Sequence, residues 1–453
     1  MKQSPPIAVR IVAQPAPDTV FAQIEPGPVF DAHHRAARAA RSKASMPVHR
    51  AWPWPLLLLL LGCAPGLGAV EIRSIDGSGN NQVAPDWGSS GSELLRLTPA
   101  AYADAVDEPR GGLVSSLPSA RAVSNSVAVQ ATSAPNASDA TDWLWQWGQF
   151  LDHDLSHTRP SSPAQPFDIP VPADDTLFDP LATGTARIGL SRSESSAASG
   201  VREQINSVTA YIDASQIYGS DAARAAVLRD SGNDGKMKMG SAVNGEATLV
   251  FNTFGLDNDG GGGDTFYVSG DVRVNEQIGL IAAHTLFSRE HNRIADTLKA
   301  RLQGGDADLI ARRDQAIAEI GNGIDSEDDF LYQSARRVVG AEIQQVTYQE
   351  FLPVLLGQNA LSAYAGYDDT SDAGIANEFS TAAYRIGHSL LSSELLRVDN
   401  GDNLVESVSL RDAFFDPQSV HQSGVDTLFK GLASQAAQAL DTQVVDDVRN
   451  FLF

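Results

Sequence analysis

The stretch from Trp143 to Ser156 constrains the fold most, because it combines aromatic and ionisable side chains in one helical pattern. In a helix, Gln149, Asp152 and His153 occupy positions i, i+3 and i+4 and share one face. Asp154 then points about 100° away from His153 and serves a different neighbour. Burying these polar groups is costly without a purpose. The stretch predicts either an amphipathic helix with a solvated face or one wall of a functional pocket.

Composition narrows the class of protein. The chain has 453 residues, of which 42% are hydrophobic and 20% charged, which is ample for a large core. This length permits two or three domains or one large α-rich enzyme domain. A formal net charge of -23 disfavours nucleic acid and anionic membranes as partners. Cys63 is the single cysteine, so no intrachain disulfide can form.

The N-terminal region has the pattern of an export signal. Residues 1–45 show no apolar period and are predicted to be disordered, or to precede the true start at Met46. Residues 46–69 contain a short basic region, the apolar run Leu56–Leu61 and a small-residue exit, which predicts a signal peptide too short for a permanent span. The residues before Cys63 resemble a lipoprotein cleavage box. Plain secretion is favoured, with periplasmic location or a lipid anchor at Cys63 as alternatives.

A second polar pattern lies between residues 209 and 215. Thr209, Tyr211, Asp213 and Ser215 recur at every second position, so an extended backbone would direct them to one side. Hydroxyl, carboxylate and carbonyl oxygens are hard ligands, and with Asp154 they approach the roughly six to eight oxygens that calcium prefers. An edge strand with alternating polar residues is the simpler alternative.

The C-terminal half is dominated by helical patterns. Arg273, Glu276 and Gln277 have helical spacing at the start of the first pattern. His284 and His291 lie further along it and are interpreted as structural histidines. The predicted helices run from 270 to about 302, from 330 to 356, from 376 to 396 and from 425 to 453. The third contains Arg385 and His388 with apolar neighbours, where a lone histidine is usually part of the core.

Five separated motifs occur in an order that matches one known family. They are Trp147–Asp154 (WGQFLDHD), Thr209–Ser215 (TAYIDAS), Gly270–Glu276 (GDVRVNE), Arg289–Arg293 (REHNR) and Tyr384–His388 (YRIGH). With them the chain resembles the animal-type haem peroxidases of the peroxidase–cyclooxygenase superfamily, in a bacterial secreted form. The resemblance covers residues 70–453 and implies one mainly α-helical haem peroxidase domain with few short strands and long irregular surface connections.

The resemblance also implies roles for individual residues. His153 matches the distal histidine, Arg273 the distal arginine and Gln149 a glutamine that contacts distal water and halide. His388 matches the proximal ligand of the haem iron, and Arg385 is expected to contact the cofactor, haem b. Such a site uses hydrogen peroxide to oxidise halides, pseudohalides or phenols through a ferryl intermediate.

Two further sets of residues match cofactor and metal positions. Asp152 and Glu276 occupy the positions that form ester links to haem methyl groups in mammalian members. The calcium ligands of the family match Asp154, Thr209, Tyr211 (through its carbonyl), Asp213 and Ser215.

The sequence departs from the family pattern in three places. Gln277 stands where the myeloid member has methionine, so no sulfonium link to haem is expected. Arg385 stands where the fatty-acid oxygenases place a radical tyrosine, with Tyr384 one residue earlier, which favours a peroxidase over a dioxygenase. The asparagine that hydrogen-bonds the proximal histidine belongs to a motif beyond Phe453, so the domain is expected to be incomplete at its C-terminus. A fatty-acid dioxygenase and a haem-less matrix or adhesion module remain the alternative functions.

Overall fold

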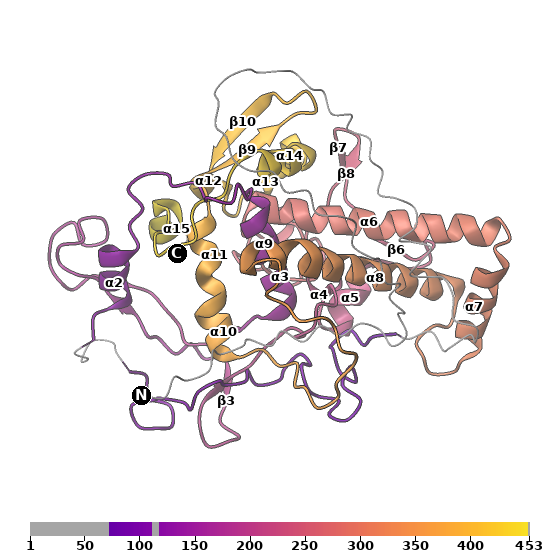
Figure 1. Ribbon diagram of the computed structural model, residues 1–453, viewed down its shortest axis with the longest axis horizontal. Helices are drawn as coiled ribbons and strands as arrows, with labels where there is room; N and C mark the ends of the chain where they lie inside the picture. The colour runs from indigo at the N-terminus through magenta and orange to yellow at the C-terminus, as the bar shows by residue number, and fades with distance from the viewer. Residues whose placement is uncertain (1–71, 111–116, 452–453) are drawn as a thin grey trace, which may run out of the picture.

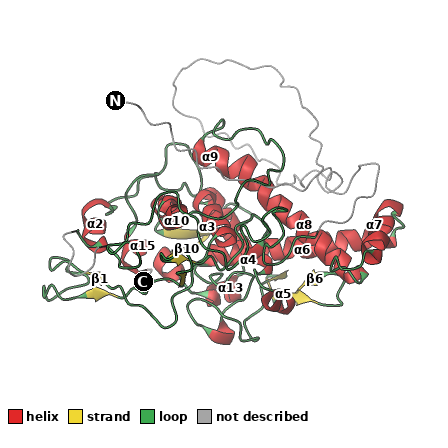
Figure 2. Ribbon diagram, turned by 90° about the horizontal axis from the view of Figure 1, so that it is seen from below, coloured by secondary structure: helices red, strands yellow, loops and turns green. Residues whose placement is uncertain are grey.

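The computed structural model describes residues 72–110 and 117–451. The predicted N-terminal extension (1–45), the predicted signal peptide (46–69) and Cys63 lie outside the described residues. Within them, no helix is both long enough and apolar enough to cross a membrane. The described part is mainly helical with small two-stranded sheets, as expected from the sequence. Figure 2 shows long irregular connections around the helices.

Two long helices form the centre of the fold. Helix α6 (Ile278–Gln303) and helix α8 (Glu327–Val346) lie side by side, and α7 (Ala307–Ala318) connects them at one end (Figure 1). Their facing sides bury aliphatic residues at helical spacing, such as Ile294 and Leu298 of α6, which are fully buried in one core cluster. This amphipathic pairing is what the apolar period of the sequence predicts.

Helix α8 begins at a side-chain cap and continues into a further helix. The Ser326 hydroxyl accepts from the Asp329 backbone N–H and donates to the Asp329 carboxylate, which caps the first turn. The helix continues through a π-helical turn (Thr347–Phe351) into α9 (Leu352–Leu356). The helical pattern predicted over 330–356 is therefore confirmed.

A hairpin lies at the C-terminal side of the molecule. Strands β9 (Glu394–Val398) and β10 (Leu404–Ser409) pair antiparallel, and α14 (Asp426–Ser434) packs against β9 (Figure 1). Gly431 permits this contact, since a Cβ there would meet the Leu396 carbonyl oxygen at 1.7 Å.

The other elements are short. The remaining helices are α2 (Ala120–Val127), α5 (Ala222–Leu228), α12 (Leu410–Ala413), α13 (Pro417–Ser423) and α15 (Asp446–Phe451), with a 3-10 turn at Gly263–Thr265. The remaining strands are β1 (Ile169–Pro170), β2 (Arg187–Ile188), β3 (Ser195–Ser196), β4 (Glu203–Gln204), β5 (Arg229–Asp230), β6 (Lys236–Met237), β7 (Ala242–Val243) and β8 (Glu246–Ala247).

The predicted helix over 376–396 is wrong as a single element. The chain forms α10 (Asn377–Thr381), a 3-10 turn (Ala383–Ile386) and α11 (Gly387–Leu390), and then enters β9. Ala382 interrupts the helix because its backbone lies at φ -130°, ψ -64°. Apolar spacing alone does not reveal this break, since both short helices still bury one side.

Two other helix boundaries also need correction. Residues 270–277 are not helical, because Gln277 is the extended N-cap of α6, at φ -155°, and accepts from the Gly279 N–H. The helical pattern over 425–453 is interrupted after Ser434, where an irregular segment forms isolated bridges with residues 129–141 before α15.

The segment 209–215 is not a strand. It forms successive bends, and Ala214 adopts a left-handed backbone (φ 67°) immediately before α4 (Ser215–Tyr218). The prediction of an extended backbone over this segment is therefore wrong. The polar side chains gather through the bends rather than through strand alternation.

Candidate active site

Helix α3 (Trp143–Leu155) carries the first part of the site and matches the predicted helix. Its polar side chains are buried: Asp152 is 7% exposed, His153 2% and Asp154 0%. The alternative of a solvated polar face is therefore excluded. The helix packs against both α6 and α11 (Figure 1). Phe150, which is fully buried, stacks on Phe287 of α6 and fixes the rotation of α3 about its axis.

His153 lies between two carboxylates that come from the segment before α6. Its Nδ1 is 3.4 Å from Oδ1 of Asp271, and its Nε2 is 3.6 Å from Oε2 of Glu276. Nδ1 has no hydrogen-bond partner within the described residues. Each ring nitrogen therefore faces a different acid. The contacts are longer than ordinary hydrogen bonds, a common state for catalytic groups before substrate is bound.

Arg273 forms a bidentate ion pair with Asp271. Its Nε and Nη2 donate to the two carboxylate oxygens over 2.9 and 2.8 Å, and its Nη1 is 3.7 Å from Oδ2 of Asp152. Burial opposes ionisation of Asp271, but Arg273 and His153 outweigh it and hold the pKa of this carboxyl well below its usual range. Burial likewise favours a neutral Arg273, yet Asp271 raises its pKa. The pair therefore stays charged in the interior.

Glu276 and Asp152 border the same region. Burial favours a neutral Glu276, but His153 and Arg273 lower the pKa of its carboxyl. Asp152 accepts a hydrogen bond from the Ser156 hydroxyl over 3.1 Å. Asp152 and Glu276, the residues predicted to link to haem, are thus both close to the distal groups.

Gln149 lies beside the predicted distal residues and is held by a second amide. Gln277 donates its Nε2 to Oε1 of Gln149 over 3.0 Å and to Oε1 of Gln146 over 2.7 Å. The Gln277 side chain thus has two roles, since its own oxygen caps α6. No site role was predicted for Gln277 from the sequence, yet its side chain holds Gln149 in place.

The predicted proximal residue His388 lies on α11, opposite α3. It is half-buried, and burial followed by the charge of Arg385 lowers its pKa, whereas Glu276 and Asp152 act in the other direction. A neutral imidazole at neutral pH is the form that binds a metal. Arg385 itself is exposed and donates its Nε to the Ser380 carbonyl over 3.0 Å.

The predicted calcium residues converge on two buried carboxylates. Ser215 donates to Asp154, and Thr209 donates its hydroxyl to Asp213 over 3.0 Å. Tyr211 directs its hydroxyl to the Trp87 carbonyl, and its own carbonyl accepts from the Asp213 N–H. Both carboxylates are fully enclosed, so burial raises the pKa of each, and the charge of Asp213 raises that of Asp154 further.

This donor set fits calcium. Oδ2 of Asp213 is buried and has no hydrogen-bond partner within the described residues, so one hard oxygen is available to a cation. The described residues contain no group of three or more His, Cys, Asp or Glu side chains placed to hold a metal. A site here would therefore depend on hydroxyl and carbonyl oxygens besides the two acids.

His284 and His291 behave as structural residues. Both are completely buried. The Leu280 carbonyl contacts Nδ1 of His284 at 2.8 Å, and His291 bridges the Tyr218 hydroxyl and the Gly235 carbonyl at 2.8 Å each. Burial lowers the pKa of His284 to about 3 and that of His291 to about 4, so both stay neutral.

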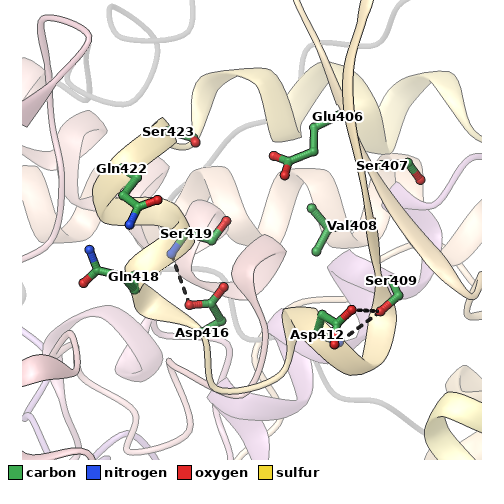
Figure 3. Close-up of a pocket in the computed structure, with 10 residues that line it drawn as sticks. All are labelled: Glu406, Ser407, Val408, Ser409, Asp412, Asp416, Gln418, Ser419, Gln422 and Ser423. Atoms are coloured by element: carbon green, nitrogen blue, oxygen red, sulfur yellow. Dashed lines mark hydrogen bonds between the residues drawn. The ribbon is translucent and has the colours of Figure 1, made fainter.

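A cavity of about 410 Å³ lies elsewhere, along β10 and α13 (Figure 3). Its acidic residues have structural roles: Asp412 accepts from the Ser409 hydroxyl, and Asp416 accepts from the Ser419 backbone N–H to cap α13. None of the predicted site residues lines this cavity.

The sequence prediction missed Asp271. It is 2% exposed and contacts two predicted catalytic residues at once. Its position two residues before Arg273 was a usable signal, because an arginine predicted to be buried needs a compensating carboxylate nearby.

A buried histidine next to a partly buried arginine, with a second histidine on the adjoining helix α11, is the arrangement expected of a haem-dependent oxidoreductase. The sequence profile of the animal haem peroxidases matches residues 72–453, and the chain belongs to that family. It is 34% identical to peroxidasin of Drosophila melanogaster over 413 residues, which cover 81% of this chain but 25% of that relative.

Solved structures show the same fold. Peroxidase A of Dictyostelium discoideum superimposes with a TM-score of 0.73 and 28% identity, covering 84% of this chain and 72% of that one. A fatty acid alpha-dioxygenase of Arabidopsis thaliana gives a TM-score of 0.59 at 19% identity, covering 81% of this chain and 56% of that one, and shows a shared fold alone.

Proposed function

We propose that this chain is a secreted peroxidase that uses hydrogen peroxide to oxidise small substrates such as halides, pseudohalides or phenols. The observation that carries the proposal is the arrangement of the buried His153 and the partly buried Arg273, both next to the buried carboxylate of Asp271. Family membership and the similarity to a solved peroxidase support it.

The two distal side chains suit the proton chemistry of peroxide. Peroxide must lose a proton from one oxygen and gain it on the other as the O–O bond breaks, and a neutral His153 imidazole can accept and return that proton at Nε2. Arg273 stays charged and stabilises the negative charge that develops on the departing oxygen. Gln149 contributes an amide that orients water or an anion beside them.

Haem would be held between the distal groups on one side and His388 on the other. A neutral imidazole of His388 suits an axial ligand of iron, and Asp152 and Glu276 are charged neighbours that suit ester links to haem methyls. Arg385, three residues before His388, would contact the same group. When bound, haem supplies the electrons that reduce peroxide and the oxidising power that acts on the substrate.

Calcium at Asp154 would hold the distal helix. Asp154 follows His153 directly in α3, and Thr209, Tyr211, Asp213 and Ser215 come from a distant segment. A cation shared by these groups would fix that segment against the residue that moves the proton.

Reconstitution with haem tests the proposal. We expect a Soret band and peroxide-dependent oxidation of a phenolic dye, with turnover lowered by roughly 100-fold or more in His153→Ala and in Arg273→Ala. Matched controls are His421→Ala and Arg293→Ala, which alter exposed residues of the same types. Unchanged turnover in both site variants would remove the assignment. Folded protein that binds no haem would instead indicate a non-catalytic matrix or adhesion module.

A fatty-acid dioxygenase is the second candidate, for one structural reason. Tyr384 donates its hydroxyl to the Gly148 carbonyl of α3 over 3.1 Å, so a phenol lies against the wall that carries His153. Oxygen uptake with an unsaturated fatty acid, abolished in Tyr384→Phe, would support this activity. Peroxide-dependent turnover that persists in Tyr384→Phe supports the peroxidase.

A further inference from the structure

Asp271 contacts both distal residues from a fixed position in the interior. Oδ1 accepts from the backbone N–H and from Nε of Arg273, over 2.8 and 2.9 Å, and Oδ2 accepts from Nη2. The same Oδ1 lies 3.4 Å from Nδ1 of His153. The Asp271 backbone N–H donates to the Gln216 carbonyl of α4. Gly270 allows this approach, since a Cβ there would meet the Ser215 carbonyl at 2.3 Å.

The His153 ring can use only one nitrogen as a base. In a neutral imidazole one nitrogen carries the proton and the other carries the lone pair. A carboxylate next to Nδ1 stabilises the proton there, which leaves the lone pair on Nε2. Nε2 faces a second carboxylate, Glu276, at the longer distance of 3.6 Å. The ester link to haem proposed for Glu276 would remove its charge and leave Asp271 as the charged acid beside the ring. Asp271 thus determines which nitrogen is available.

The ion pair with Asp271 likewise fixes the orientation of Arg273. The carboxylate occupies the Nε and Nη2 edge of the guanidinium, so the planar group cannot rotate. Nη1 then points toward Asp152, at 3.7 Å, on the side of the distal helix. A simple buried ion pair explains the arginine contact but does not account for the position of the same Oδ1 beside Nδ1 of His153.

We propose that Asp271 is a positioning residue that orients His153 and Arg273 together, with Nε2 of His153 kept as the proton acceptor. This inference rests on the function proposed above for the two distal residues. The Asp271 carboxylate would set both the tautomer of His153 and the orientation of the Arg273 guanidinium.

The discriminating variant is Asp271→Asn. Asparagine has the same shape and keeps one oxygen for Arg273, but it is neutral, so the negative charge that stabilises a proton on Nδ1 of His153 is lost. The same substitution in a histidine-orienting aspartate of a serine protease acts through the wrong tautomer. Asp142→Asn is the matched control, because Asp142 is equally buried at the start of α3 but bonds to the Ser392 hydroxyl.

Two measurements on the haem-loaded full chain test the inference. Selective ¹⁵N-histidine labelling of the ferrous carbon-monoxide form, with His153 assigned by loss of its signal in His153→Gln, reports which nitrogen is protonated. We expect Nδ1–H in the wild type, and a smaller Nδ1–H population with a larger Nε2–H population in Asp271→Asn. Stopped-flow mixing should show the rate constant for peroxide falling at least about tenfold in Asp271→Asn, with the KM for the reducing substrate and the rate of Asp142→Asn unchanged within twofold.

The results separate this inference from the proposed function. If His153→Gln reacts slowly with peroxide but Asp271→Asn keeps both its rate and the Nδ1–H tautomer, the positioning role is overturned and the proposed function stands. If His153→Gln reacts at the wild-type rate, the proposed function fails. An Nε2–H tautomer in the wild type overturns the role of Asp271 whatever the rates are.

Discussion

Ser215 donates both its backbone N–H and its hydroxyl to the same carboxylate oxygen of Asp154, over 2.6 and 2.8 Å. Asp154 follows His153 in α3, and Ser215 begins α4, so these two bonds join the distal helix to a segment 61 residues away. The stability of this junction should depend on the cation that the surrounding oxygens suit.

Chelation should therefore affect stability and the haem site together. Removing calcium with EGTA should lower the melting temperature and shift the Soret band, because a ligand at 100 times its Kd contributes about 2.7 kcal/mol. Asp154→Asn should reproduce both effects without chelator. The exposed Asp264→Asn is the control. A chelated protein with unchanged melting and spectrum would count against the calcium site.

Covalent attachment of haem is a separate prediction. After incubation with peroxide, haem should resist acidic organic extraction, because the proposed function assigns ester links to Asp152 and Glu276. Asp152→Asn and Glu276→Gln should each remove one link, and the double variant should release all haem. Glu290→Gln controls for loss of an acid elsewhere. Freely extractable haem in the treated wild type would show that neither link forms.

Asp142 should give the fold a pH dependence of its own. Burial raises the pKa of its carboxyl to about 7, although the hydrogen bond from the Ser392 hydroxyl opposes the shift. Below pH 4 the group is protonated in both states, and its contribution to stability is complete. Between about pH 4 and 7 the unfolded state ionises first, so stability falls as the pH rises, by up to about 4 kcal/mol.

Asp142→Asn should abolish this dependence. The difference in unfolding free energy between variant and wild type, measured in urea, should grow in favour of the variant from pH 4 to pH 8. A constant difference over that range would show that Asp142 ionises normally in the folded state.

The packing of α6 makes a simpler prediction. Leu298 is fully buried, so Leu298→Ala should lower the free energy of unfolding by about 2 to 5 kcal/mol through lost burial and the cavity left behind. Ile320→Ala removes a comparable aliphatic side chain that is fully exposed and should change stability by less than about 0.5 kcal/mol. Equal effects of the two substitutions would contradict the assigned core.

The sequence was most informative for the distal helix, whose residues serve both the core and the site. The helix over Trp143–Ser156 was predicted to within one residue, because aromatic spacing and the shared face of Asp152 and His153 both require it. The grouping of Arg273 and Glu276 with this helix came from resemblance to the family rather than from spacing. Contacts between residues that lie about 120 positions apart leave no periodic pattern in the sequence around either residue.

The errors have a common physical cause. Apolar spacing indicates which side of a segment is buried, but does not show whether the backbone stays helical along it. Ala382 breaks the predicted 376–396 helix through its backbone angles, and Gln277 delays the start of α6 by capping it. Asp271 was missed because its role depends on two partners, His153 and Arg273, that meet it only in the folded chain.

The bridges between residues 129–141 and the segment after α14 have a consequence for synthesis. Asn136 donates its side-chain NH₂ to the Ala437 carbonyl, 301 residues later in the chain, and the Asp142 N–H donates to the Gln435 carbonyl just before α3. At about 5 to 20 residues per second, a ribosome makes Ala437 about 15 to 60 s after Asn136. The residues that lead into the distal helix therefore acquire these hydrogen-bond partners only late in translation.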